Sequence, residues 1–273
     1  MAQLFERTIG VTARVGLVGH EPNHAALLAG EIDLYADYLG TAVRRYLNLQ
    51  PPKSAAATSR VVRDAARERW GIQWLRPFGF NNSYAVILRR ALAEQLTAEQ
   101  VADLVPHAEG LRLGATAEVL DPDTGVRFAP GGYAGLRGKY GLSFGCTLEL
   151  PAEYGATFDA LGAGQVDAII DFPVNPRMVS LDLVELRDAR HFFAPYFAAP
   201  VVSGRFLAAH PYARAALERL SGRVDNRRAA LMNHALEMEG RQPEDVAAEL
   251  VDEITADLTV VGRVRRGSHR RAG

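Results

Sequence analysis

The segment Val166–Phe172 constrains the fold of this chain more than any other part of the sequence, because it is nearly all apolar. Such a run is typical of a β-strand with both faces buried, as in sheets that helices cover on both sides. Helical and extended patterns alternate elsewhere, with helices expected at 55–70 and Gly132–Tyr140 and an alternating strand at Val11–Val18. This alternation predicts an α/β protein with mainly parallel sheets.

Composition narrows the class of protein further. The chain has 273 residues, enough for two medium domains or one large one, and 48% of them are hydrophobic, which is typical of a globular protein with a real core. A net charge of −1 gives no reason to expect nucleic acid as a partner. The single cysteine, Cys146, excludes an internal disulfide and a thiolate metal site.

The two ends of the sequence carry separate expectations. The first residues lack the basic and apolar regions of a secretory signal, and no run approaches the ~18 apolar residues of a membrane span, so the chain would be cytoplasmic if Met1 is the true start. The C-terminal segment is basic and lacks apolar anchors, which predicts a disordered tail over 262–273.

One segment matches a known zinc-binding catalytic pattern. His20-Glu21-Pro22-Asn23-His24 fits H-E-x-x-H, in which two histidines on one helical face bind zinc. Proline is tolerated only in the first turn of a helix, so we expect the helix to begin at Pro22 and to leave His20 outside it. The pattern is then a chance match, and no cofactor, metal ligand or catalytic residue is predicted.

Aromatic residues at the junctions between predicted elements form the strongest pattern. Tyr38, Tyr84, Phe172 and Tyr196 each lie beside an expected strand end. Several rings facing one point can hold a methylated ammonium group by cation–π attraction. Ordinary core and hinge aromatics would produce the same pattern, and the residues alone leave both interpretations open.

Several motifs in the same order resemble the family of osmoprotectant-binding proteins of ABC importers, the ProX and OpuC type. Gly30-Glu31-Ile32-Asp33-Leu34-Tyr35 through Gly40-Thr41 resembles the family's GEIDLYPEYTGT signature. Gly79–Ala85 resembles GFNNTYA, and the most specific stretch runs from Leu183 to Val202. The resemblance covers about residues 3 to 256.

The resemblance implies a two-lobed periplasmic-binding-protein fold of type II, with the ligand in the cleft between the lobes. Lobe one would comprise 1–80 plus 197–273, and lobe two 85–192. The two segments that cross between the lobes would lie near Phe80–Tyr84 and Pro173–Tyr196. The family's ligands are glycine betaine, choline and similar compounds, and its partners are ABC permease and ATPase subunits.

The resemblance also implies site residues. Tyr38, Tyr84 and Tyr196 match cage tyrosines of the family, and Phe172 stands where a fourth tyrosine is usual. Thr41 matches a threonine that helps to hold the ligand's carboxylate, and Asn82 matches a residue beside the ligand. Asp171, next to the cage ring, is an added acidic candidate for ligand binding.

Three departures from the family pattern have consequences. Pro173-Val174-Asn175-Pro176 replaces the usual STDG, and the arginine that grips a betaine carboxylate has only a shifted counterpart in Arg127. Together with Asp171 this favours a ligand of net positive charge, such as choline. The family's signal peptide and first strand have no match, so we expect a longer, exported gene product in the periplasm or cell envelope, or a chain that folds poorly.

The sequence therefore predicts the binding component of an importer for a quaternary ammonium compound, without enzymatic activity. Two alternatives stay open. One is a cytosolic ligand-sensing domain that reuses the fold, and the other is a metalloenzyme built on His20 and His24.

Overall fold

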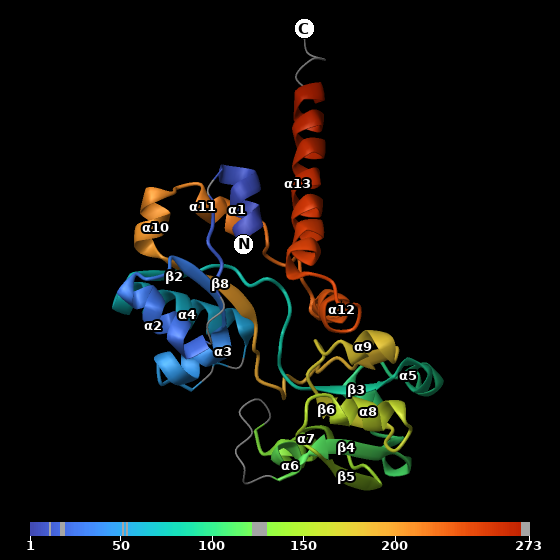
Figure 1. The fold of residues 1–273 in the computed structure, drawn as a ribbon. Coiled ribbons are helices and arrows are strands. Elements are labelled where there is room, and N and C mark those ends of the chain that lie inside the picture. The colour runs from blue at the N-terminus through green and yellow to red at the C-terminus, as the bar shows by residue number, and fades with distance from the viewer. Residues whose placement is uncertain (11, 17–19, 51, 53, 122–129, 269–273) are drawn as a thin grey trace.

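The structure is a computed structural model that describes residues 1–273 except 11, 17–19, 51, 53, 122–129 and 269–273, with the side chains of 20–21 and 257–268 also outside the description. It contains two separate β-sheets, each packed against its own helices (Figure 1). The chain passes from the first sheet to the second between residues 75 and 84 and returns between 186 and 197.

The first sheet has three strands in the order β1-β8-β2, and both pairings are antiparallel. The helices around it are α1 to α4 with a π-turn, and α10 to α13. Its strands are β1 (Leu34–Tyr38), β2 (Ile72–Trp74) and β8 (Ala198–Ser203). Its helices are α1 (Ala2–Ile9), α2 (His20–Ala29), α3 (Leu39–Thr41), the π-turn η1 (Ala42–Tyr46), α4 (Ala55–Trp70), α10 (Gly204–Ala209), α11 (Ala213–Glu218), α12 (Asn226–Glu237) and α13 (Pro243–Ser268).

The second sheet has five strands in the order β5-β4-β6-β3-β7. Its strands are β3 (Ala85–Arg89), β4 (Arg112–Thr116), β5 (Cys146–Leu150), β6 (Ala168–Asp171) and β7 (Leu183–Glu185). Its helices are α5 (Arg90–Leu96), the 3-10 turns η2 (Val101–Leu104) and η3 (Ala108–Gly110), α6 (Ala117–Leu120), α7 (Gly132–Tyr140), α8 (Ala156–Gly162) and α9 (Arg177–Ser180).

The prediction of mainly parallel sheets is wrong. Within the described residues, the parallel strand pairings are those of β4 with β5 and with β6, whereas β3 lies antiparallel to β6 and β7. Parallel neighbours require a crossover connection, usually a helix. Strands β3 and β8 enter their sheets from the segments that join the two sheets, so no crossover fixes their direction.

The apolar segment that ends in β6 is buried on both faces, as predicted. Ala168 and Ile170 belong to a core cluster with Tyr84, and Phe172 packs against it. Ile169 belongs to a different cluster, built around Phe158 of α8. Period-two alternation therefore sends successive side chains of this strand to opposite sides of the sheet.

Helix boundaries follow local signals closely. Ser54 caps α4 by accepting a hydrogen bond from the backbone N–H of Ala57 at 3.2 Å, and Gly71 ends the helix with φ of 66°. The helices predicted at 55–70 and Gly132–Tyr140 are confirmed.

Other local predictions are corrected. Residues 12–16 form no strand, and 11 and 17–18 of that predicted strand lie outside the described residues. Helix α2 begins at His20 rather than at Pro22, which its first turn accommodates. Helix α13 continues to Ser268, although a disordered tail was expected from residue 262, and 269–273 lie outside the description.

Candidate functional site

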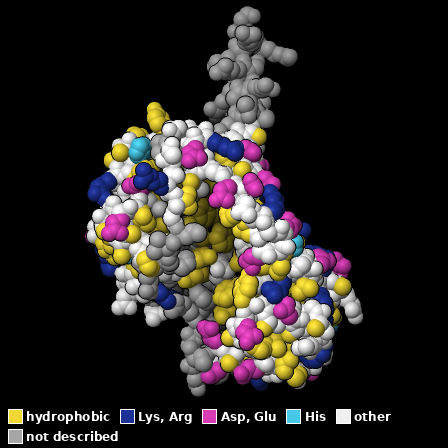
Figure 2. All heavy atoms as spheres, viewed as in Figure 1, with side chains coloured by type: hydrophobic (Ala, Val, Ile, Leu, Met, Phe, Trp, Pro, Cys, Tyr) yellow, Lys and Arg dark blue, Asp and Glu magenta, His cyan; other side chains and the backbone are white. Residues whose placement is uncertain are grey.

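A hollow lies between the two parts of the molecule, and hydrophobic side chains line much of it in the view of Figure 2. The predicted ring residues belong to elements on both sides of this division, as two stacked pairs. We call Tyr38, Tyr84, Phe172 and Tyr196 the ring set.

The first pair, Tyr38 and Tyr196, belongs to the first sheet. Tyr38 ends β1 and Tyr196 precedes β8, and these strands pair with Tyr38 opposite Ala198. The ring centroids lie 4.8 Å apart with an interplanar angle of 20°. The Tyr196 hydroxyl shares a hydrogen bond with the Thr41 hydroxyl in α3. A side chain at Gly40 would overlap the Tyr196 ring, so this close approach requires glycine.

The second pair, Tyr84 and Phe172, belongs to the second sheet. Strands β3 and β6 are neighbours, with Ala85 opposite Asp171, so the residues just outside this pairing are brought together. The ring centroids of Tyr84 and Phe172 lie 4.4 Å apart with an interplanar angle of 24°.

Asn82 forms hydrogen bonds with both members of the first pair. Its side-chain Nδ2 donates to the Tyr38 hydroxyl at 3.2 Å, and its backbone N–H donates to the carbonyl of Tyr196 at 3.1 Å. Its Oδ1 is buried and has no hydrogen-bond partner among the described residues. An unpaired buried acceptor is costly unless a ligand or water satisfies it. Asn82 can therefore present a polar atom to a bound molecule.

Asp171 is placed differently from the other predicted residues. Its carboxylate accepts hydrogen bonds from the hydroxyl of Thr157 in α8 at 2.5 Å and from the backbone N–H of Phe172 at 2.7 Å. It thus points toward α8, on the opposite face of the sheet from the Phe172 ring. The structure brings Tyr38, Thr41, Asn82 and Tyr196 together beside the first sheet and Tyr84 with Phe172 beside the second, and it leaves the Asp171 carboxylate outside both groups. Asp171 therefore gives no reason to expect a ligand of net positive charge.

The electrostatics of the rings suit a cation. Burial raises the pKa of the Tyr38 and Tyr84 hydroxyls above the ordinary value, and the charges of Glu118 and Asp171 raise the pKa of Tyr84 further. Both phenols are therefore neutral at physiological pH and act through their ring faces. Within each pair the rings touch each other, so a cation can contact only the outer faces and edges of the pairs.

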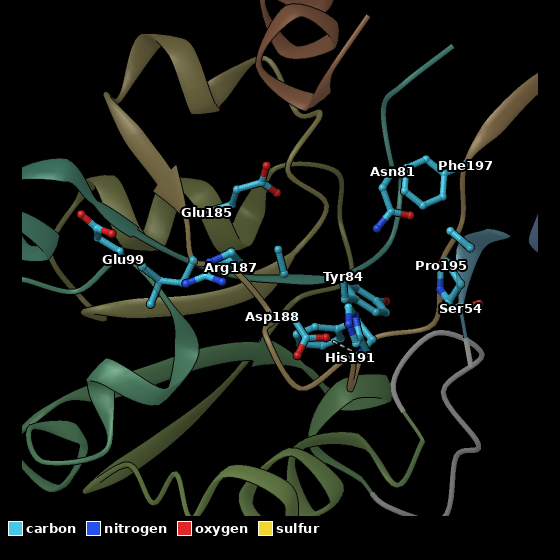
Figure 3. Close-up of a pocket in the computed structure, with 14 residues that line it drawn as sticks. Ser54, Asn81, Tyr84, Glu99, Glu185, Arg187, Asp188, His191, Pro195 and Phe197 are labelled. Atoms are coloured by element: carbon cyan, nitrogen blue, oxygen red, sulfur yellow. Dashed lines mark hydrogen bonds between the residues drawn. The ribbon is translucent and has the colours of Figure 1, made fainter. Parts of the chain in front are cut away.

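A cavity of about 480 Å³ adjoins Tyr84 at the two connecting segments (Figure 3). Its lining includes Ser54 from the first part of the molecule and Asp188 and Phe193 from the second. The Asp188 carboxylate accepts hydrogen bonds from the Tyr140 hydroxyl at 2.5 Å and from the Phe193 N–H at 2.8 Å. These two bonds fix the segment that forms this wall of the cavity. None of the other three rings lines this cavity, which thus flanks the ring set.

Asn81, which also lines the cavity, is a residue that the sequence prediction missed. Its Oδ1 accepts from the backbone N–H of Tyr196 at 2.6 Å, and its own N–H donates to Oδ1 of Asn226 in α12 at 2.7 Å. It also bridges to Phe197 across the two connecting segments. Its place in the Gly79–Ala85 motif was the only available signal.

The zinc alternative finds no support in the described part of the chain, where no group of three or more metal-ligating side chains occurs. The His24 Nδ1 atom lies 3.2 Å from the Tyr35 hydroxyl, and its ring stacks on Tyr46 with centroids 3.9 Å apart. The side chains of His20 and Glu21, and the whole of Arg127, lie outside the described residues.

Comparison with known proteins identifies the class of protein. Residues 1–253 match the model of the family described as the substrate binding domain of the ABC-type glycine betaine transport system. The chain belongs to this family. Its members are binding components of transporters and not enzymes, and its ligands are small quaternary ammonium compounds.

Individual relatives agree with this assignment. The chain is 29% identical over 254 residues to a glycine-betaine-binding protein of Pseudomonas aeruginosa, covering 92% of this chain and 80% of the relative. It is 23% identical to the carnitine transport binding protein OpuCC of Listeria monocytogenes, with the same coverage. A solved structure of a glycine betaine/carnitine/choline ABC transporter superposes with a TM-score of 0.82 at 25% identity, covering 92% of this chain and 91% of that one.

The expected two-lobed α/β fold is confirmed by this structural likeness. Among the described helices, none combines the length and the apolar character that crossing a membrane requires.

Proposed function

We propose that this chain binds a quaternary ammonium osmoprotectant, such as glycine betaine or choline, between the two ring pairs and delivers it to an ABC permease and its ATPase subunits. The observation that carries the proposal is the pair of ring stacks, Tyr38 with Tyr196 and Tyr84 with Phe172, one on each sheet. A trimethylammonium group has no N–H to donate, so aromatic faces and shape must recognise it.

The geometry accounts for closure around the ligand. We propose that 1–80 plus 197–273 form one lobe and 85–192 the other, so that each lobe carries one ring pair. A cation bound between the outer faces of both pairs would favour the closed arrangement, because only that arrangement offers it both faces. The closed form would be the one that docks on the permease.

The boundary between the lobes includes one bridging element. Helix α12 packs through Ala229 in a hydrophobic cluster beside the first sheet. Its Asn226 nevertheless donates to both carboxylate oxygens of Glu185 in β7, a strand of the second sheet, at 3.1 and 2.9 Å. Its Asn233 donates to the carbonyl of Val174 at 2.8 Å. The proposed hinge therefore consists of the two connecting segments and α12. We also propose that the protein acts outside the cytoplasm, where such a binding component meets its permease.

Calorimetric titration with glycine betaine, choline, carnitine and ergothioneine tests the proposal. We expect micromolar binding of at least one compound, and loss of that binding in Tyr38→Ala and Tyr196→Ala. Tyr212→Ala is the matched control, because Tyr212 lies at the start of α11, is 77% exposed and belongs to neither ring pair. A folded protein that binds none of the four compounds would contradict the proposal.

A further inference from the structure

The two sheets share a local arrangement at the ring set. Tyr38 and Phe172 each follow an aspartate directly, Asp37 and Asp171. In both cases one carboxylate oxygen of the aspartate accepts the backbone N–H of the ring residue, at 2.7 Å. The arrangement occurs at the end of β1 in the first sheet and at the end of β6 in the second.

The second oxygen of each of these carboxylates is held by hydroxyl groups of other residues. Asp37 is 1% exposed, and its second oxygen accepts from the hydroxyls of Tyr35 at 3.1 Å and Tyr46 at 2.9 Å. The second oxygen of Asp171 accepts from the hydroxyl of Thr157, a buried residue in α8. Both aspartates therefore join a ring residue's backbone to hydroxyl groups in the core of the same lobe.

We infer that Asp37 and Asp171 are positioning residues, which set the Tyr38 and Phe172 rings for the ligand without touching it; this inference rests on the proposed function. The pairing of β6 with β3 ends at Asp171, one residue before Phe172. The carboxylate supplies the acceptor at that point and fixes the backbone from which the ring projects. A ring fixed in advance has less freedom to lose when the ligand binds.

The arrangement also accounts for the direction in which the carboxylate next to Phe172 points. Alternation along a strand sends consecutive side chains to opposite faces. When the ring at position 172 faces Tyr84, the carboxylate at 171 must face α8. The acidic group is thus directed into its own lobe and away from the cation.

Variants of Asp171 separate a positioning role from a ligand contact. Asparagine keeps an oxygen that can accept the Phe172 N–H, whereas alanine has none. We expect Asp171→Ala to weaken binding of glycine betaine and choline about tenfold or more, a change of about 1.4 kcal/mol. We expect Asp171→Asn to restore affinity to within about threefold of the original protein. Equal losses in both variants, or no loss in Asp171→Ala, would overturn the inference.

Thr157→Val is the matched control, because it removes a hydrogen bond to the same carboxylate and leaves the contact with the Phe172 N–H in place. If Asp171 serves only to stabilise the fold, affinity should fall in step with thermal stability in Asp171→Ala, Asp171→Asn and Thr157→Val. A positioning role predicts that Thr157→Val loses less affinity than Asp171→Ala at a comparable loss of thermal stability. Affinity that falls with stability in Thr157→Val as it does in Asp171→Ala would count against positioning.

The Phe172 amide proton provides a readout without any ligand. In protein labelled with ¹⁵N-phenylalanine, we expect its resonance to move upfield in Asp171→Ala and to stay in place in Thr157→Val. An unchanged resonance in Asp171→Ala would overturn the inference. If the original protein bound none of the four compounds, the proposed function would fail, while this measurement would still decide whether Asp171 holds the backbone of Phe172.

Discussion

The ring of Tyr84 stacks on the ring of Phe172, with centroids 4.4 Å apart, although the two residues come from different strands. The antiparallel pairing of β3 with β6 creates this contact, because Ala85 and Asp171 are opposite each other. The corresponding pair in the other sheet, Tyr38 and Tyr196, depends on the pairing of β1 with β8. The sheets thus assemble the two pairs of the proposed recognition surface from four separate segments of the chain.

Removing the Phe172 ring face tests whether a phenyl group can serve where the family has tyrosine. We expect Phe172→Leu to weaken binding of the quaternary ammonium ligand roughly two- to thirtyfold, as loss of a cation–π contact of about 0.5–2 kcal/mol implies. Phe172→Tyr should stay within about threefold, because the ring face remains. Titration calorimetry measures both, and similar affinities for the leucine and tyrosine variants would contradict the prediction.

The absence of a side chain at residue 40 is expected to determine where the Tyr196 ring lies. Gly40→Ala would introduce a Cβ that overlaps this ring, so the ring must move. Overpacking typically costs about 1–3 kcal/mol, so a displaced ring that cannot meet the ligand should weaken binding roughly fivefold to 150-fold. Gly138→Ala is the matched control, since Gly138 lies in α7 and a Cβ there meets nothing within 4 Å. It should leave affinity unchanged and thermal stability equal or slightly higher. Equal affinities in the two variants would show that Tyr196 does not depend on Gly40.

Asn81 is expected to hold Tyr196 through the main chain. Asn81→Ala leaves the Tyr196 N–H without its acceptor at 2.6 Å, which should cost about 1–3 kcal/mol of unfolding free energy and also weaken ligand binding. Asn226→Ala removes the neighbouring contact with the Asn81 N–H but keeps the Asn81–Tyr196 hydrogen bond. Urea unfolding and titration of both variants should show the larger loss of affinity in Asn81→Ala, and the reverse order would contradict this account.

The stability of the first lobe is expected to depend on pH through His24. The Tyr35 hydroxyl donates to Asp37, so its oxygen accepts from His24 Nδ1, and the buried Nε2 has no partner among the described residues. This pattern fits a neutral imidazole. Burial lowers the pKa of His24, and the opposing effect of Asp37 is smaller.

The sign of the pH effect follows from proton binding. Because the folded state disfavours protonated His24, the unfolded state binds more protons below its pKa of about 6.5. The unfolding free energy should therefore fall as the pH decreases below about 6.5, by at most about 1.4 kcal/mol per pH unit from this group. Urea unfolding between about pH 5 and about pH 8 measures the slope, and His24→Gln should reduce it. An identical slope in His24→Gln would show that other groups control the dependence.

The sequence alone determined the local features. The apolar run at Val166–Phe172 predicted a strand buried on both faces, and the helical pattern over 55–70 placed α4 correctly. The motifs that resemble the osmoprotectant-binding family identified the class of protein and predicted the ring residues. These inferences depend on neighbouring residues, which the sequence displays directly.

Only the tertiary structure decided which side chains meet and which way they face. The sequence places Asp171 beside Phe172, but the packing of α8 on the sheet turns the carboxylate toward Thr157. The sequence shows Asn81 only as one of two adjacent asparagines, but the contact of its side chain with the Tyr196 N–H requires both connecting segments. Strand direction was likewise predicted wrongly, because it depends on how distant segments enter a sheet. Contacts between residues far apart in the chain have no local signal, and these contacts build the candidate site.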